Sequence, residues 1–199
     1  MTLLVALLLP TMVSLGFWQL RRADENRGLL LLAQKRQQQP AMPISQLPLN
    51  RLPADITGGH TEAWQYLPVR LHGAWLPESF LVENQLDNGR NGYHVVSVMQ
   101  LDNDAHILVN RGWVPAPASR NALPQYPEAT AGQEELGHIY VSAYILSDEP
   151  VYAETGWPRR VGRLQVPGFT RELGYEVMPL VIRLEQGSPS ALTAHWPVV

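Results

Sequence analysis

The clearest structural signal in this chain is residues 93–114, which read YHVVSVMQLDNDAHILVNRGWV. Two runs rich in β-branched and other apolar side chains, 93–101 and 106–114, flank the polar tetrapeptide DNDA at 102–105. Such runs are typical of strands, and Asp and Asn favour a tight turn between them. This segment therefore predicts an antiparallel β-hairpin.

Further elements are expected on both sides of this hairpin. Strand character is found in four more segments: 66–73, 80–86, 137–146 and 178–184. Two Asn-Gly pairs within 87–92 indicate another hairpin turn, and residues 165–173 form a short predicted helix closed by Gly174. The fold class is therefore mainly β (α+β), a small antiparallel barrel or sandwich with one short added helix. A long N-terminal transmembrane helix is expected to precede it.

The first twenty residues differ from the rest of the chain because they carry no charge. As a helix they would reach about 30 Å, the thickness of the hydrocarbon core of a bilayer. A cleaved signal peptide is the weaker alternative, since neither a basic leader nor a small-residue cleavage site is visible. A buried soluble helix of this length would normally carry a charge. We therefore predict a transmembrane helix over residues 1–20.

The end of this helix is predicted to lie at the membrane–water interface, where aromatic and basic side chains gather. The predicted interface residues are Phe17, Trp18, Gln19, Arg21 and Arg22. A helical stalk is expected over 21–39, a Pro- and Gly-rich linker over 40–61, and a soluble, mainly β domain over 62–199. The two arginines would favour a cytoplasmic domain, but large domains cross membranes despite nearby charge. Local charge therefore leaves the orientation open.

The charge and residue content exclude several classes of function. Fifteen basic and eighteen acidic residues give a net charge of −3, which provides no basic field for a nucleic acid. The absence of cysteine excludes a disulfide scaffold, an iron–sulfur cluster and a thiol nucleophile. The sequence contains no serine nucleophile elbow and no phosphate-binding glycine loop. The acidic pairs Glu134-Glu135 and Asp148-Glu149 are interpreted as solvated loop carboxylates. We predict no catalytic residues.

The six histidines are scattered and do not form a metal-ligand pattern. Pairing Leu101 with His106 in the predicted hairpin places His94 opposite Trp113. His94 and His106 would then lie at opposite ends of the ladder, too far apart to share a metal ion. We therefore predict no metal site.

The most distinctive motif is NRGWVP at residues 110–115. Strand alternation places Arg111 and Trp113 on one face, where the guanidinium could stack on the indole. Gly112 permits a bulge or a close approach of another backbone. Asn110, Arg111, Gly112 and Trp113 are therefore a candidate partner-binding patch, since Arg and Trp are common in binding hot spots. The alternative is a structural one, in which the tryptophan simply plugs the end of a strand.

Four motifs, in this order, resemble the Surfeit-locus family of cytochrome c oxidase assembly factors. They are LGFWQLRR at 15–22, YLPV at 66–69, GY at 92–93 and NRGWVP at 110–115. The first and the last are the most specific, and the resemblance covers nearly the whole chain.

The resemblance implies a protein of the bacterial inner (plasma) membrane, with two spanning helices around a soluble domain that faces the periplasm. It implies an assembly factor that binds cytochrome c oxidase subunits or other assembly factors and is not an enzyme. Some bacterial members handle haem a. The alternative is a membrane-anchored periplasmic enzyme such as a hydrolase, using His94 or His106 with a nearby carboxylate. A nucleophile, a histidine and a carboxylate meeting in one pocket would favour that alternative.

In this family a second membrane helix, with a histidine near its start, follows the soluble domain. The sequence ends at AHWPVV, residues 194–199, where that helix should begin. We therefore expect a chain clipped at both ends that lacks the second helix. His195 lies before the position of the family's histidine, so the resemblance implies haem a only for a longer protein and gives it no ligand here.

Overall fold

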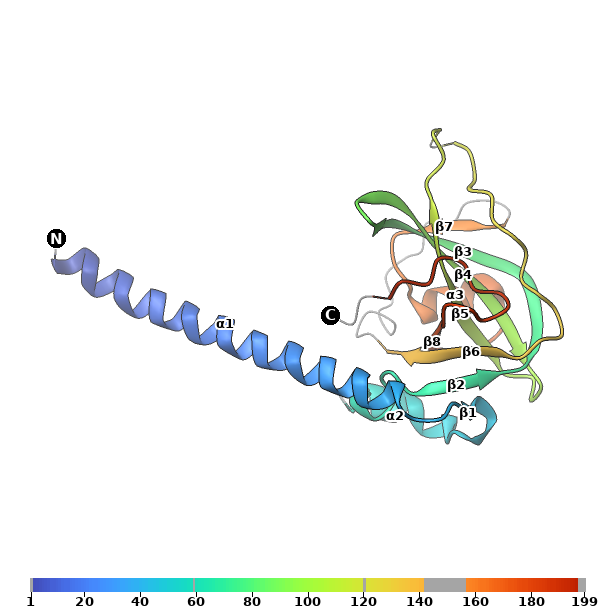
Figure 1. Ribbon diagram of the computed structural model, residues 1–199, viewed down its shortest axis with the longest axis horizontal. Coiled ribbons are helices and arrows are strands. Elements are labelled where there is room, and N and C mark those ends of the chain that lie inside the picture. Colours follow the sequence, from blue (N-terminus) through green and yellow to red (C-terminus); the bar gives the residue numbers. More distant parts are fainter. Residues whose placement is uncertain (1, 59, 120, 142–156, 197–199) are drawn as a thin grey trace. The chain divides into compact units, whose positions relative to one another are not determined.

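The computed structural model describes residues 2–58, 60–119, 121–141 and 157–196. The chain divides into two compact units, residues 2–38 and residues 39–196 within this described part. The first unit is a single helix, and the second contains the whole β-sheet (Figure 1).

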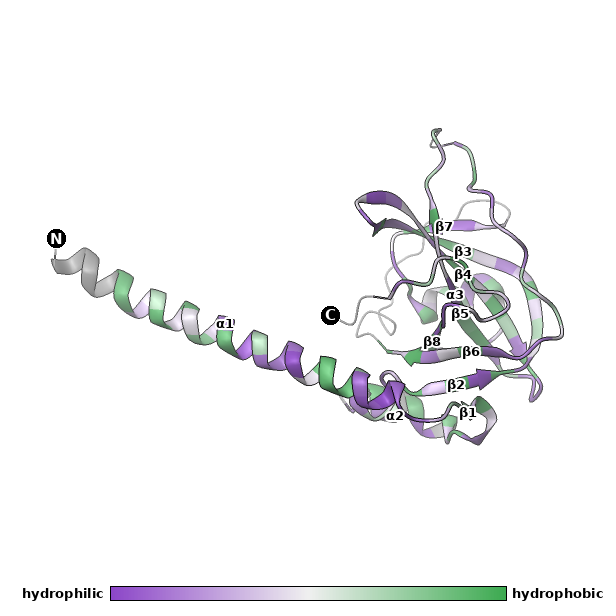
Figure 2. Cartoon of the chain, viewed as in Figure 1, coloured by the Kyte–Doolittle hydropathy of each residue, from purple (hydrophilic) through white to green (hydrophobic). Residues whose placement is uncertain are grey.

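Helix α1 runs from Thr2 to Gln37 and contains Pro10. The helix is continuous over the apolar segment and most of the residues expected to form a stalk. Figure 2 shows mainly apolar residues before the middle of the helix and a mixture of hydrophilic and apolar residues from there to its end. Leu9, Met12 and Phe17 are each more than half exposed. In the described residues no helix is long and apolar enough to cross a membrane. The transmembrane assignment of residues 1–20 therefore stays a prediction.

The second unit is built on one eight-stranded sheet in the order β1-β2-β6-β8-β5-β4-β3-β7. The strands are β1 (Met42–Pro43), β2 (Pro68–Leu71), β3 (Gly73–Asp87), β4 (Arg90–Leu101), β5 (His106–Pro115), β6 (Glu135–Tyr140), β7 (Arg159–Val161) and β8 (Val177–Leu184). The helices are α2 (Leu52–Thr57) and α3 (Val166–Leu173), with short 3-10 turns η1 (Ile44–Gln46), η2 (Leu49–Arg51) and η3 (Thr61–Ala63). Five predicted strands are confirmed, as is the short helix closed by Gly174, a left-handed residue with φ 77°. The strand predicted over 137–146 begins earlier, at Glu135, and ends at Tyr140, and residues 142–146 lie outside the described part of the chain.

The sheet is mixed, which corrects the expected all-antiparallel arrangement. Two antiparallel groups, β2-β6-β8 and β5-β4-β3, are joined through the parallel pair β5–β8. The short strands β1 and β7 also pair in parallel, with β2 and β3 respectively. The chain reaches β8 through helix α3, and such a crossover returns the strand in the parallel sense. Nothing in the periodicity of residues 177–184 reveals the direction of its partner.

The sheet curls back on itself, as Figure 1 shows. Strands β2 and β3 lie second and seventh in the sheet order, yet His72 alone separates them in the chain. Because consecutive residues are bonded, the two sides of the sheet must meet at this corner. This curvature favours the barrel among the two predicted architectures.

Both faces of the sheet carry apolar cores. One face buries Met99, Ile107 and Ile182 together with Leu52 of α2. The other buries Phe80 and Val98 against helix α3. The segment 40–61, predicted as a linker, is instead part of the folded unit, because its apolar side chains fill the first core. Its prolines and glycines shape short turns there.

Strand β5 contains a bulge at the NRGWVP motif. Gln100 lies opposite His106 and Val96 opposite Asn110, but Val95 lies opposite Gly112, so Arg111 is an extra residue. The predicted pairing of His94 with Trp113 is confirmed. His106 pairs with Gln100 and not with the predicted Leu101, a shift of one residue, and the extra residue Arg111 cancels this shift before Trp113. Gly112 has φ +127°, and a Cβ there would lie 2.6 Å from the Thr193 carbonyl oxygen. The predicted bulge and the predicted close approach both occur.

Replacing Gly112 with alanine should lower the free energy of unfolding by about 2–4 kcal/mol, because it adds backbone strain and a clash with Thr193. Gly89→Ala is the matched control: its φ is also positive, at 76°, but nothing lies within 4 Å of an added Cβ. That variant should lose about 1–2 kcal/mol. Urea denaturation followed by circular dichroism measures both. Equal losses in the two variants would show that the Thr193 contact is unimportant.

Candidate functional site

The four residues of the predicted partner-binding patch lie inside the protein. Asn110 is 3% exposed, Arg111 2% and Trp113 8%, and Gly112 is buried as well. The Asn110 side-chain oxygen accepts a hydrogen bond from the Gly112 backbone at 3.2 Å, which stabilises the bulge. So little exposed area favours the structural interpretation of the motif. The docking role stays a prediction.

Arg111 connects three parts of the chain. Its Nε donates to the Ser190 carbonyl at 2.9 Å, and Nη2 donates to the Pro127 carbonyl at 2.8 Å. Its guanidinium lies 5.9 Å from the centroid of the Tyr126 ring. The predicted stacking on Trp113 is therefore replaced by a contact with Tyr126, because the bulge breaks the alternation on which that expectation rested. Burial lowers the pKa of Arg111, and Tyr126 and Glu135 oppose this shift.

Trp113 crosses the sheet to strand β3. Its Nε1 donates to the Gln85 carbonyl at 2.9 Å, and its backbone N–H donates to the Thr193 carbonyl at 2.7 Å. The indole passes over Gly92 so closely that a Cβ at that position would collide with it. Two motifs of the family resemblance, GY at 92–93 and NRGWVP at 110–115, therefore pack against each other.

Glu135 is a buried residue that the sequence analysis missed. It is fully buried, which corrects its interpretation as a solvated carboxylate, whereas Glu134 remains on the surface. The Ser188 hydroxyl and the Ser190 backbone N–H, at 3.2 Å, both donate to its Oε2. Alternation could have revealed it, because Glu135 shares the inward face of β6 with Gly137 and Ile139. The other acidic pair, Asp148-Glu149, lies outside the described residues.

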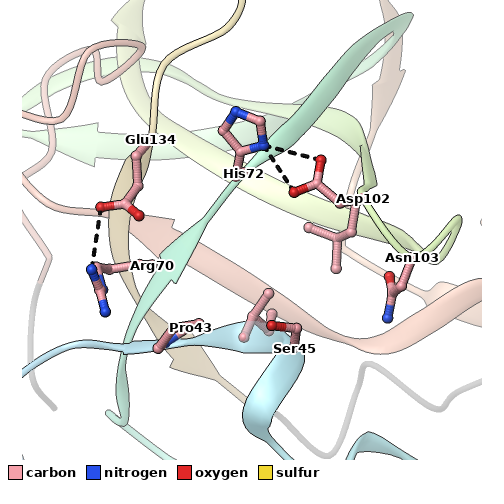
Figure 3. Close-up of a pocket in the computed structure, with 9 residues that line it drawn as sticks. Pro43, Ser45, Arg70, His72, Asp102, Asn103 and Glu134 are labelled. Atoms are coloured by element: carbon pink, nitrogen blue, oxygen red, sulfur yellow. Dashed lines mark hydrogen bonds and ion pairs between the residues drawn. The ribbon is translucent and has the colours of Figure 1, made fainter.

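A pocket with a volume of about 250 Å³ lies at the His72 corner (Figure 3). His72 Nδ1 contacts both carboxylate oxygens of Asp102, at 2.9 and 3.0 Å. Arg70 forms an ion pair of 3.8 Å with Glu134 at the other end. Ser45, from η1, and Asn103 complete the polar lining.

This pocket tests the hydrolase alternative. A serine hydrolase needs a histidine that bonds a carboxylate through one nitrogen and the serine hydroxyl through the other. His72 and Asp102 satisfy the first contact, but Figure 3 shows the second nitrogen of His72 facing away from Ser45. The histidines named for that alternative contact aromatic rings instead: His94 lies 5.2 Å from Trp196 and His106 lies 4.2 Å from Tyr175. The described contacts therefore supply no catalytic triad.

Two other histidines, His94 of β4 and His138 of β6, are neutral near pH 7. His94 and His138 each have a pKa lowered to about 4, chiefly by burial and also by the charge of Arg183. Neutral imidazoles can bind iron, but Arg183 lies on the strand next to His138, and Trp196 contacts both Arg183 and His94. The positive charge of Arg183 lies close enough to lower the pKa of both imidazoles, and it would repel an iron cation bound to either, so the residues do not fit a shared haem. Among the described residues no three metal-ligating side chains cluster.

The predicted membrane-interface residues lie on helix α1. Phe17 is 66% exposed, and the Arg22 guanidinium lies 5.6 Å from the centroid of the Trp18 ring. Gln19 and Arg21 are also exposed. The helix keeps these five residues together within six positions, but their contact with a membrane stays a prediction.

Fold and motifs define a curled mixed-sheet domain that follows a long N-terminal helix and is closed by a buried Asn-Arg-Gly-Trp bulge. The chain belongs to the SURF1 family, whose sequence model matches residues 6–198.

Curated relatives carry the same family name. A SURF1-like protein of Rickettsia felis is 29% identical over 114 residues, which are 56% of this chain and 45% of that protein. A SURF1-like protein of Rickettsia bellii is 30% identical over 105 residues, 51% of this chain and 38% of the relative. A SURF1-like protein of Dictyostelium discoideum is 29% identical over 115 residues, which are 55% of this chain and 41% of that protein. The match thus covers less than half the length of each relative.

Replacing Arg111 with lysine should lower the free energy of unfolding by about 1–3 kcal/mol, because one ammonium cannot reach both carbonyls as the planar guanidinium does. Arg90→Lys, at an exposed hairpin position, should leave it unchanged. Chemical denaturation of the purified variants measures the difference. Full stability of Arg111→Lys combined with lost function would instead support the docking interpretation.

The stability of the domain should depend on pH through His94 and His138. Their folded pKa of about 4 lies below the ordinary 6.5, so the unfolded state takes up protons first as the pH falls. The stabilisation is complete above pH 6.5 and is lost as the pH falls toward 4, by on the order of 3 kcal/mol per histidine. Denaturation curves at pH 7.5 and 4.5 measure this loss. A His94→Gln/His138→Gln variant that loses just as much stability as the wild type would contradict it.

Proposed function

We propose that this chain is a membrane-tethered assembly factor for cytochrome c oxidase that works by binding oxidase subunits or other assembly factors. The observation that carries the proposal is the family match across residues 6–198. The ordered motifs at 15–22, 66–69, 92–93 and 110–115 are the sequence basis of the same assignment. A binding role also agrees with the contacts described for His72, His94 and His106, none of which lies in a nucleophile–histidine–carboxylate arrangement.

The proposal includes the inner membrane as the location and the periplasm as the compartment of the β domain. Exposed apolar side chains along α1, such as Leu9, Met12 and Phe17, support a membrane anchor, because large apolar groups are costly in water. Trp18 and Arg22 support an interfacial position at its end. Handling of haem a is part of the proposal only for a longer protein with a second membrane helix.

Complementation tests the assembly role. In a bacterium that lacks its own SURF1-family gene, this chain joined to a second membrane helix should restore the cytochrome c oxidase activity of isolated membranes. Arg111→Lys should reduce that activity in step with its protein level if Arg111 is structural, and Arg90→Lys should restore it fully. Activity that stays at the level of the deletion strain, with the wild-type chain abundant and folded, would refute the assembly role.

Reporter fusions test the location. Alkaline phosphatase joined after Val199 should be active, because that enzyme matures only in the periplasm, whereas a fused cytoplasmic reporter should be silent. The opposite pattern would place the β domain in the cytoplasm.

A further inference from the structure

Arg183 of β8 is enclosed by aromatic rings. Its guanidinium carbon lies 3.4 Å from the centroid of the Tyr140 ring and 5.1 Å from that of Trp196. Tyr140 comes from β6, the neighbour of β8, and Trp196 is fixed by a 2.7 Å hydrogen bond from its Nε1 to the Leu184 carbonyl. Cation–π contacts of this kind hold a guanidinium in place and leave its N–H edge available for an acceptor.

This arginine differs from others in the protein by what it contacts. Arg70 and Arg159 form ion pairs with Glu134 and Glu172, and Arg111 donates to two carbonyl oxygens. Within the described part of the chain Arg183 forms no ion pair. Its side chain hydrogen-bonds Tyr140, and its buried Nε, like those of Arg70 and Arg159, has no acceptor. A cation removed from water without a counter-charge is costly, so such a group is normally matched by an anion.

The neighbouring titratable groups do not supply that anion. His138 lies directly opposite Arg183 on β6, and the His94 ring packs 5.2 Å from Trp196. Both imidazoles are neutral near pH 7, since their pKa values are about 4. Asp87, which lies near His94, contacts His195 Nδ1 at 3.3 Å. The cluster therefore retains the positive charge of Arg183.

We propose that Arg183 binds the carboxylate of a ligand with an aromatic or other apolar body. The planar fork of a guanidinium matches the two oxygens of a carboxylate, which fixes the charged end. The edges of the Tyr140 and Trp196 rings, whose faces contact the guanidinium, provide apolar contacts for the rest of the ligand. The neutral imidazole of His138 adds a hydrogen-bonding group beside the same position. This site is separate from the assembly role and does not depend on it.

Benzoate and benzamide test the proposal, because they share a ring and differ in charge. The probe is added to the chain of residues 1–199 in detergent, and thermal unfolding is followed by circular dichroism. Benzoate at saturating concentration should raise the unfolding midpoint by a few degrees, and benzamide should not. Benzoate should also raise the pKa of His94 and His138 in an NMR titration, because its charge offsets that of Arg183. Equal midpoint shifts with both probes, or with benzoate and inorganic phosphate, would overturn the assignment.

Three variants locate the effect. Arg183→Lys keeps the charge but loses the fork, and should weaken benzoate binding at least tenfold. Arg183→Gln should abolish binding and should itself raise the pKa of both histidines; if it does not fold, the lysine variant decides alone. Arg70→Gln removes a surface arginine and should respond to benzoate as the wild type does. A wild-type response in Arg183→Lys would refute the proposal.

Discussion

The extra residue in β5 controls how the end of this sheet is closed. Because Arg111 has no partner on β4, the strand bends, and its guanidinium reaches the carbonyls of two segments that are far apart in sequence. Gly112 lets the backbone of Thr193 approach, and the 192–193 segment then pairs with β5 through hydrogen bonds at Arg111 and Trp113. The buried carboxylate of Glu135 fixes the same C-terminal segment by accepting hydrogen bonds from Ser188 and Ser190. The loop that contains Pro127 and the C-terminal segment from Ser190 to Thr193 therefore both depend on the bulge at Arg111.

This arrangement explains why the motifs at 92–93 and 110–115 depend on each other. Gly92 has no side chain and thereby provides the space that the Trp113 indole occupies where it reaches Gln85. A side chain at position 92 would displace the tryptophan and thereby the segment that its backbone binds. The two motifs are therefore needed for the same packing contact. Their resemblance to the family motifs reflects the fold before it reflects a function.

Local patterns predicted most strands, the turns and the left-handed cap at Gly174, because short-range backbone preferences determine them. They could not predict that β5 and β8 run parallel, since that depends on a crossover through α3. The His94–Trp113 pairing was correct despite an initial register error, which the unforeseen bulge cancelled. The contacts of Arg111 and the burial of Glu135 arise from segments more than fifteen residues away, and no single stretch of sequence contains that information.

The one-residue corner at His72 also constrains the order in which the protein can fold during synthesis. Strands β2, β3, β4 and β5 leave the ribosome early, but β2 must wait for β6, and β8 must fill the place between β6 and β5. The β5 edge therefore stays unpaired until some seventy further residues have been made. An open edge of this kind invites pairing with other chains. Nascent chains should consequently need a chaperone for that interval, and truncations before residue 184 should aggregate instead of forming a smaller domain.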